Sequence, residues 1–187
     1  MQKNENPIVL SLVLLIIAVI VAGLLSFTNS ITKDKIAENV KLQQDQAKQE
    51  VCPSADEFRD LEFNDGNVKA VFCAMKNEEL QGWCVNVVPS GYGGAIDMMV
   101  GVDLDYQVTC VKVISNSETA GLGAKCTDDS FRGQFEGKTD AVKVIKNGTP
   151  KDDEIVAITG ATITSKAITS GVKDAILAVK DGRVKSE

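Results

Sequence analysis

The stretch ITGATITSK, residues 158–166, governs how the C-terminal part of the chain folds. It combines five β-branched residues, four side-chain hydroxyls and one Gly-Ala pair. β-Branched residues favour a strand, whereas hydroxyl side chains favour the start of a helix. The stretch therefore predicts the end of a strand or a tight loop that leads into a helix, with Thr164 or Ser165 as the N-cap hydroxyl.

The residues behind this stretch carry the pattern of an amphipathic helix. Apolar side chains recur on one helical face at Ile168, Val172, Ala175, Ile176 and Val179. Asp181-Gly182 follows, and glycine commonly closes a helix. The pattern predicts a C-terminal helix with one apolar face that ends at this pair.

Four short segments ahead of that helix are rich in branched or aromatic residues, as strands are. They are NVKAVFCAM (67–75), WCVNVV (83–88), AIDMMVGV (95–102) and QVTCVKVI (107–114). The tight link at 103–106 predicts an antiparallel hairpin between the last two. Because there is neither an internal repeat nor a βαβ alternation, the sequence predicts an α+β domain with a mainly antiparallel sheet.

Shorter elements are expected between this hairpin and the C-terminal helix. Residues 127–135 have helical character, with Asp128 and Asp129 in the first turn, where acidic side chains are favourable. Residues 142–145 predict a short strand, and NGTP at 147–150 predicts a turn.

The N-terminal part of the chain contains an uncharged apolar run, IVLSLVLLIIAVIVAGLLSF, at residues 8–27. A helix of this length covers the hydrocarbon thickness of a bilayer. The alternative is a cleaved signal peptide. However, the run is longer than a signal core, it has almost no charged segment before it, and neither a small-residue cleavage site nor a lipidation cysteine follows. We therefore expect an uncleaved membrane anchor.

The expected organisation is a short tail at 1–7, a transmembrane helix at 8–27, a polar helical stalk at 28–52 and one domain at 53–187. Cys52-Pro53-Ser54 marks the end of the stalk. Lysines lie on both sides of the apolar run, so the positive-inside rule gives no clear orientation and leans weakly toward a cytoplasmic domain.

The composition excludes several classes of protein. The net charge of −6 without a basic stripe argues against nucleic-acid binding. The absence of histidine excludes His-ligated haem, His-containing zinc sites and Ser-His or Cys-His nucleophile pairs. We expect neither a metal site nor a catalytic side chain.

The cysteines show no metal-binding spacing. They are Cys52, Cys73, Cys84, Cys110 and Cys126, without any C-x-x-C pair. We expect them to be buried small apolar residues. One disulfide stays possible if the domain is extracytoplasmic, but the sequence does not choose the pair.

Three glycine-bearing segments stand out: PSGYGGAI (89–96), SETAGLG (117–123) and ITGATITSK. Each by itself is explained as a loop or turn in which glycine permits unusual backbone angles. The third also suits an anion, because a helix N-terminus offers unpaired N–H groups and a partial positive charge. It is neither a Walker A loop nor a dinucleotide-binding fingerprint, so the residues allow an anion without naming it.

The order of these elements resembles one protein family. A single N-terminal span, PSGYGGAI, SETAGLG, the FRGQFEGK block at 131–138 and ITGATITSK follow one another as in the G subunit of the Rnf electron-transport complex. The chain is also similar to the C subunit of the Na⁺-translocating NADH:quinone reductase. The resemblance covers essentially the whole chain, and the compact domain favours the Rnf protein.

The resemblance implies a covalent flavin. In this family the last residue of the S/T-G-A-T element is esterified to the phosphate of FMN, which assigns that role to Thr162, with Thr159, Gly160 and Ala161 forming its loop. A flavin transferase makes the bond from FAD outside the cytoplasmic membrane. Its usual motif has an acidic residue where this chain has Val156.

The resemblance also implies which residues line the flavin. They are Glu118, Thr119, Gly121, Leu122 and Gly123, with Tyr92 as a further candidate for the same cleft. The flavin carries the redox chemistry, so the task of these residues is to hold it and tune its potential.

The function implied by the resemblance is that of a membrane-anchored electron carrier in an ion-translocating ferredoxin:NAD⁺ oxidoreductase. It would be a single-pass protein of the cytoplasmic membrane with its domain on the extracytoplasmic face. Its partners would be the other Rnf subunits, among them membrane subunits and a second flavin-carrying subunit, and the flavin transferase. The alternatives are the C subunit of the quinone reductase and a membrane-tethered assembly module without flavin.

Overall fold

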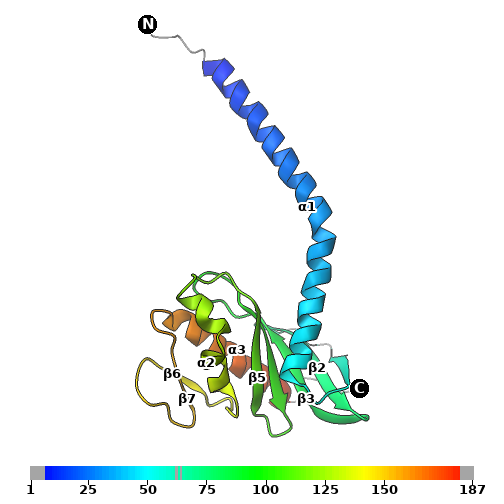
Figure 1. Cartoon of the computed structure of the whole chain (residues 1–187), viewed down its shortest axis with the longest axis vertical. Helices are drawn as coiled ribbons and strands as arrows, with labels where there is room; N and C mark the ends of the chain where they lie inside the picture. The colour runs from blue at the N-terminus through cyan, green and yellow to red at the C-terminus, as the bar shows by residue number, and fades with distance from the viewer. Residues whose placement is uncertain (1–6, 62, 64, 182–187) are drawn as a thin grey trace. The chain divides into compact units, whose positions relative to one another are not determined.

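The computed structural model describes residues 7–61, 63 and 65–181 of the chain (Figure 1). It consists of two compact units, residues 1–42 and 43–187. Most of the expected tail at 1–7, and Gly182 of the expected helix end, lie outside the described residues.

Helix α1, Pro7–Val51, forms the described part of the first unit and contributes its last residues to the second. Its segment Pro7–Lys33 contains an 18-residue window with a mean hydropathy of 3.3 and is long and apolar enough to cross a membrane. The second unit begins at Gln43, ahead of the expected domain start at Pro53. The reason is that Ala47 and Val51, near the end of the helix, are buried in the core of that unit.

The second unit is built on a five-stranded sheet whose neighbouring strands are all antiparallel and follow one another in chain order. Its strands are β1 Glu57–Leu61, β2 Val68–Lys76, β3 Glu79–Val87, β4 Asp97–Asp103 and β5 Val108–Ser115. The predicted antiparallel sheet and the β4–β5 hairpin are therefore confirmed. Two further strands, β6 Lys143–Ile145 and β7 Glu154–Val156, pair in parallel.

Two helical segments cover the two faces of the large sheet. Helix α3, Thr162–Lys180, packs on one face, and all five residues predicted to form its apolar side are buried. The last turn of α1 packs on the other face, against Cys84 and Met99. A Cβ atom on Gly101 of β4 would lie 2.6 Å from the carbonyl oxygen of Val51, so the close approach of α1 to the sheet requires glycine there.

The predicted start of α3 is wrong. The helix begins at Thr162 with Ala161 as N-cap, and no side chain caps it. Thr164 and Ser165 lie in its first turn and are buried. Their hydroxyls do not cap the helix, because each forms a hydrogen bond elsewhere. Thr164 donates to Glu118, and Ser165 accepts from the backbone of Ile158.

The segment predicted as one helix at 127–135 is broken. It consists of the end of a 3₁₀ helix η1, Gly123–Thr127, then α2, Asp129–Arg132, and η2, Gly133–Phe135. Asp128 has an extended backbone with ψ of 137°, which separates η1 from α2. Phe131 and Phe135 nevertheless reach the core and contact each other edge to face.

Candidate functional site

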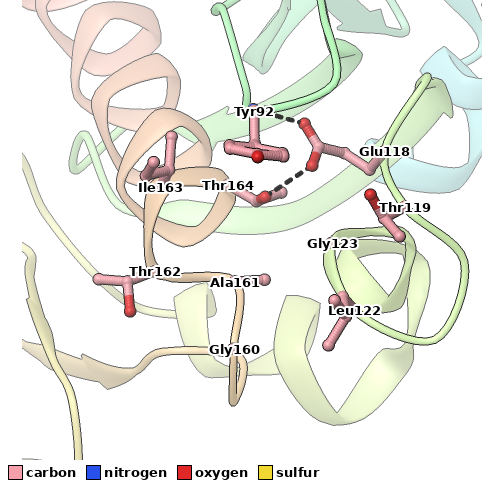
Figure 2. Close-up of a pocket in the computed structure, with 10 residues that line it drawn as sticks. All are labelled: Tyr92, Glu118, Thr119, Leu122, Gly123, Gly160, Ala161, Thr162, Ile163 and Thr164. Atoms are coloured by element: carbon pink, nitrogen blue, oxygen red, sulfur yellow. Dashed lines mark hydrogen bonds between the residues drawn. The ribbon is translucent and has the colours of Figure 1, made fainter.

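A cavity of about 430 Å³ lies where three loop or helix-start segments of the second unit meet. The size is within the usual range for small-molecule sites. It is lined by residues from the loop after β3, from the segment after β5 and from the start of α3 (Figure 2). These are Tyr92, Glu118, Thr119, Leu122, Gly123, Gly160, Ala161, Thr162, Ile163 and Thr164.

The carboxylate of Glu118 joins the three segments. Its Oε1 accepts hydrogen bonds from the backbone N–H groups of Tyr92, at 2.7 Å, and Gly93, at 3.0 Å. Its Oε2 accepts a hydrogen bond of 2.8 Å from the hydroxyl of Thr164 (Figure 2). Hydrogen bonds to an ionised acceptor are stronger than neutral ones, so this single side chain holds the walls of the cavity together.

Several glycines of the motifs are explained by the packing around this carboxylate. A Cβ atom on Gly91 would overlap with Glu118 Oε1, and one on Gly123 would overlap with Glu118 Oε2. A Cβ atom on Gly93 would overlap with the carbonyl oxygen of Ser117. These three positions therefore need glycine because the loops pack directly on residues 117–118.

Gly160 has a different role, at the turn before α3. Its φ of +77° is in the left-handed region that glycine adopts without strain. Ser165 supports this turn, because its Oγ accepts a hydrogen bond of 3.0 Å from the N–H of Ile158 and donates one of 2.9 Å to the carbonyl oxygen of Ala161. The turn thus delivers Thr162 to the first position of α3.

The hydroxyls of the stretch ITGATITSK fall into two groups. Those of Thr164 and Ser165 are hydrogen-bonded. Those of Thr159 and Thr162 have no hydrogen-bond partner within the part of the chain that the structure describes. Of these two, Thr162 lines the cavity, at the uncapped N-terminus of α3. The first N–H groups of a helix lack intrahelical partners and favour an anion, and no acidic residue lies in the first turn of α3.

The structure brings together most, but not all, of the residues expected at the site. Tyr92, Glu118, Thr119, Leu122, Gly123, Gly160, Ala161 and Thr162 line the cavity. Gly121 does not line it, and Thr159 lines a neighbouring cleft with Val156 and Asp128. Ile163 and Thr164 line the cavity but were missed. The sequence predicted Thr164 as a helix cap and not as a residue of the site. Ile163 could have been predicted because it is an apolar residue directly after Thr162.

The buried hydroxyl of Ser165 offers a test of this turn. We expect Ser165→Ala to destabilise the domain by about 1–3 kcal/mol, because the buried N–H of Ile158 loses its acceptor. Thermal or urea unfolding of the full-length protein in detergent measures the effect. Ser170→Ala is the control, since Ser170 is exposed on the same helix and its removal should change stability by less than about 0.5 kcal/mol. Equal stabilities of the two variants would contradict this role of Ser165.

Two family models match the chain. The model described as FMN-binding domain matches residues 91–177, which include every residue that lines the cavity. The model described as RnfG N-terminal region matches residues 2–51.

Curated relatives cover nearly the whole chain. The G subunit of the proton-translocating ferredoxin:NAD⁺ oxidoreductase complex of Clostridium ljungdahlii is 37% identical over 181 residues, which is 94% of this chain and 93% of that protein. This chain belongs to the RnfG family. The G subunit of the Na⁺-translocating complex of Acetobacterium woodii is 36% identical, over 89% of this chain and 88% of its own. The predicted membership of the RnfG family is confirmed.

Solved structures of the quinone-reductase relative share the fold of this RnfG family member. The C subunit of the Na⁺-translocating NADH-quinone reductase from Parabacteroides distasonis matches with a TM-score of 0.51 and 24% identity, over 63% of this chain and 64% of that chain, which is less than two thirds of its length. NqrC of Shewanella oneidensis matches with a TM-score of 0.53 and 20% identity, over 67% of each chain.

Proposed function

We propose that the chain is a membrane-anchored electron carrier that holds FMN through a phosphoester at Thr162. The observation that carries the proposal is the hydroxyl of Thr162, which has no partner among the described residues and lines the cavity at the uncapped N-terminus of α3. The FMN-binding domain family that matches residues 91–177 supports the choice of the ligand.

The residues of the cavity fit the chemistry of FMN. The N-terminus of α3 suits the phosphate, whose ester would join the Thr162 hydroxyl. Three apolar side chains that line the cavity are exposed, Tyr92 at 73%, Ile163 at 55% and Leu122 at 44%, and they offer surfaces for a flat aromatic ring. The flavin, when bound, supplies one- and two-electron chemistry, and the protein positions it and sets its environment.

The cavity contains one charged side chain among the residues that line it, the Glu118 carboxylate. Both of its oxygens accept hydrogen bonds from the protein, so it is held in place beside the ligand space. A fixed negative charge disfavours added negative charge nearby. Glu118 would therefore contribute to the electronic environment of the flavin as well as to the shape of the site.

The proposed setting is a complex that couples electron transfer between ferredoxin and NAD⁺ to ion translocation, as the names of the relatives describe. One of these relatives is named for protons and the other for Na⁺, at nearly equal identity, so the coupling ion does not follow from similarity. The other Rnf subunits would be its partners, and a flavin transferase would attach the cofactor. The segment Pro7–Lys33 would anchor it as a single span in the cytoplasmic membrane, with the domain on the extracytoplasmic face.

The two alternatives have less support. Similarity to the quinone-reductase proteins is limited to the fold, at 24% and 20% identity. An assembly module without flavin is motivated by Val156, which stands where the transferase motif usually has an acidic residue. The backbone of Val156 is held by the amide of Gln134, which accepts from its N–H at 2.7 Å and donates to its carbonyl at 3.4 Å.

The decisive experiment is in-gel flavin fluorescence. The full-length chain, produced together with its flavin transferase, should give a fluorescent band on a denaturing gel, and the same chain produced without the transferase should not. Protease treatment of right-side-out vesicles should remove the domain, whereas inside-out vesicles should protect it. A non-fluorescent band despite active transferase would refute the carrier function, and the opposite protection pattern would refute the extracytoplasmic face.

A further inference from the structure

We propose that Cys52 and Cys84 form a disulfide in the mature protein, which ties the C-terminal end of α1 to strand β3. The inference rests on the extracytoplasmic face in the proposed function, because disulfides persist in oxidising compartments. The bond would fasten the end of the helix that carries the membrane span onto the domain that carries the cavity.

Each of the two thiols forms a hydrogen bond with the backbone close to the other cysteine. The Cys52 thiol donates to the carbonyl oxygen of Trp83, the residue before Cys84, at 3.7 Å. The Cys84 thiol donates to the carbonyl oxygen of Lys48 at 3.8 Å. That same oxygen accepts the N–H of Cys52 at 3.0 Å. Both residues are buried in one apolar cluster between α1 and the sheet, which brings the two side chains together.

The sheet register excludes the other cysteines as partners of Cys84. Cys110 is two strands away, because Cys84 pairs with Gly101 and Gly101 pairs with Cys110. Two strand spacings are roughly 10 Å, beyond the reach of about 7 Å between the Cα atoms of a disulfide. Cys73 pairs with Trp83 and so points to the opposite face of the sheet, where Cys126 also lies in the core under α3.

The environment makes Cys52 the attacking thiol. The neighbouring Cys84 thiol lowers the pKa of Cys52, whereas the proximity of Cys52 and burial raise the pKa of Cys84. Cys52 is also the more accessible of the two, 7% exposed against 0% for Cys84. The thiolate is the form that exchanges with disulfides, so reaction begins at Cys52.

The oxidant is the disulfide of an extracytoplasmic thiol oxidoreductase. The Cys52 thiolate attacks one sulfur of this disulfide and forms a mixed disulfide, and the first thiolate of the oxidant leaves. Cys84 then loses its proton and attacks the Cys52 sulfur, which releases the second thiolate. Two protein thiols are oxidised by two electrons, the oxidant is reduced to two thiols, and it receives the two protons.

The test counts thiols in the full-length protein, exported and produced with its transferase. After acid quenching and denaturation, free thiols are blocked with N-ethylmaleimide, and thiols freed by reduction are labelled with a polyethylene glycol maleimide. We expect two labels after reduction, and a protease-derived peptide pair that joins Cys52 to Cys84. Five blocked thiols before reduction, or a cross-linked pair that contains another cysteine, would overturn the proposal.

Cysteine-to-serine variants test which two thiols form the bond. Cys52→Ser and Cys84→Ser should each abolish both labels, and Cys110→Ser, the matched control on the same face of the sheet, should keep them. Reductant should lower the Tm of the wild type by roughly 5 °C or more and leave the Tm of the double Cys52→Ser, Cys84→Ser variant unchanged. Equal shifts in the two proteins would contradict a stabilising disulfide.

The outcomes separate this inference from the proposed function. A fluorescent chain with its domain outside and five free thiols overturns the disulfide alone. A cross-linked chain without fluorescence overturns the flavin alone. Five free thiols on a domain that vesicles place in the cytoplasm overturn both the disulfide and the face on which it rests.

Discussion

The Thr162→Ala variant is expected to lose covalent FMN completely while its domain stays folded. The hydroxyl of Thr162 has no hydrogen-bond partner among the described residues, and the residue occupies the first position of α3. Its removal should change the free energy of unfolding by less than about 0.5 kcal/mol, because no hydrogen bond of the hydroxyl is lost and alanine is a good helix former. In-gel fluorescence measures the flavin, and thermal unfolding measures the fold.

Three further variants serve as controls for Thr162→Ala. Thr162→Ser keeps an acceptor hydroxyl and should keep the fluorescent band. Thr159→Ala removes the other unpartnered hydroxyl of the stretch, which lines the neighbouring cleft, and should also keep the band. Thr164→Ala removes a hydrogen bond to Glu118 but leaves the Thr162 hydroxyl in place, so the fluorescent band should persist. A band that persists in Thr162→Ala and disappears in Thr159→Ala would move the attachment point to Thr159.

The Gly101→Ala variant is expected to destabilise the second unit by about 3 kcal/mol. A Cβ atom at this position would overlap with Thr109 Oγ1 and would lie 2.6 Å from the carbonyl oxygen of Val51 and 3.0 Å from Val51 Cβ. The Thr109 hydroxyl already donates to the same carbonyl oxygen at 2.9 Å. Because the contacts include backbone on a buried face, the end of α1 must move away from the sheet, and overpacking of this kind costs up to about 3 kcal/mol.

Urea unfolding of the full-length protein, followed by tryptophan fluorescence, measures this loss, since Trp83 is the one tryptophan of the chain and lies in β3. Gly133→Ala is the matched control. Gly133 has helical backbone angles, and its Cβ atom would meet nothing closer than 4.0 Å. It should be neutral or slightly stabilising. If Gly101→Ala were equally neutral, the close approach of α1 to β4 would be wrong.

The elements with strong local periodicity were predictable from the sequence. The apolar spacing from Ile168 to Val179 predicted the buried face of α3, and the short link at 103–106 predicted the β4–β5 hairpin. Strand β1 escaped notice because EFRDL has no regular alternation, and its side chains lie on a largely exposed edge strand. The start of α3 was misplaced because the partners of its hydroxyls are remote or unusual. Thr164 bonds to Glu118, 46 residues away.

For the site, too, the sequence predicted some features and the structure was needed for others. The motif residues pointed to one cleft through their resemblance to a family, and the structure places eight of the expected residues around one cavity. The reason for the glycines did not follow from sequence. Gly91 and Gly123 both pack on the Glu118 carboxylate; for Gly91 this contact joins segments that are separate in the chain, and for Gly123 it lies within one loop. From the sequence alone, both glycines are explained as ordinary turn residues.

Local patterns in the sequence were sufficient for the apolar helix, the antiparallel sheet, the amphipathic last helix and the family, because these depend on spacing and on motifs within short segments. Packing was needed to tell the hydroxyls apart. Thr164 bonds to Glu118 of another segment, and Ser165 bonds to the turn ahead of α3, so Thr162 is the hydroxyl of the stretch ITGATITSK that lines the cavity without a hydrogen-bond partner among the described residues. Packing also places Cys52 beside Cys84, because strand register and the last turn of α1 set which thiols lie against each other's backbone. Periodicity reports on local burial, whereas hydrogen bonds and thiol contacts between distant segments depend on how the chain is packed.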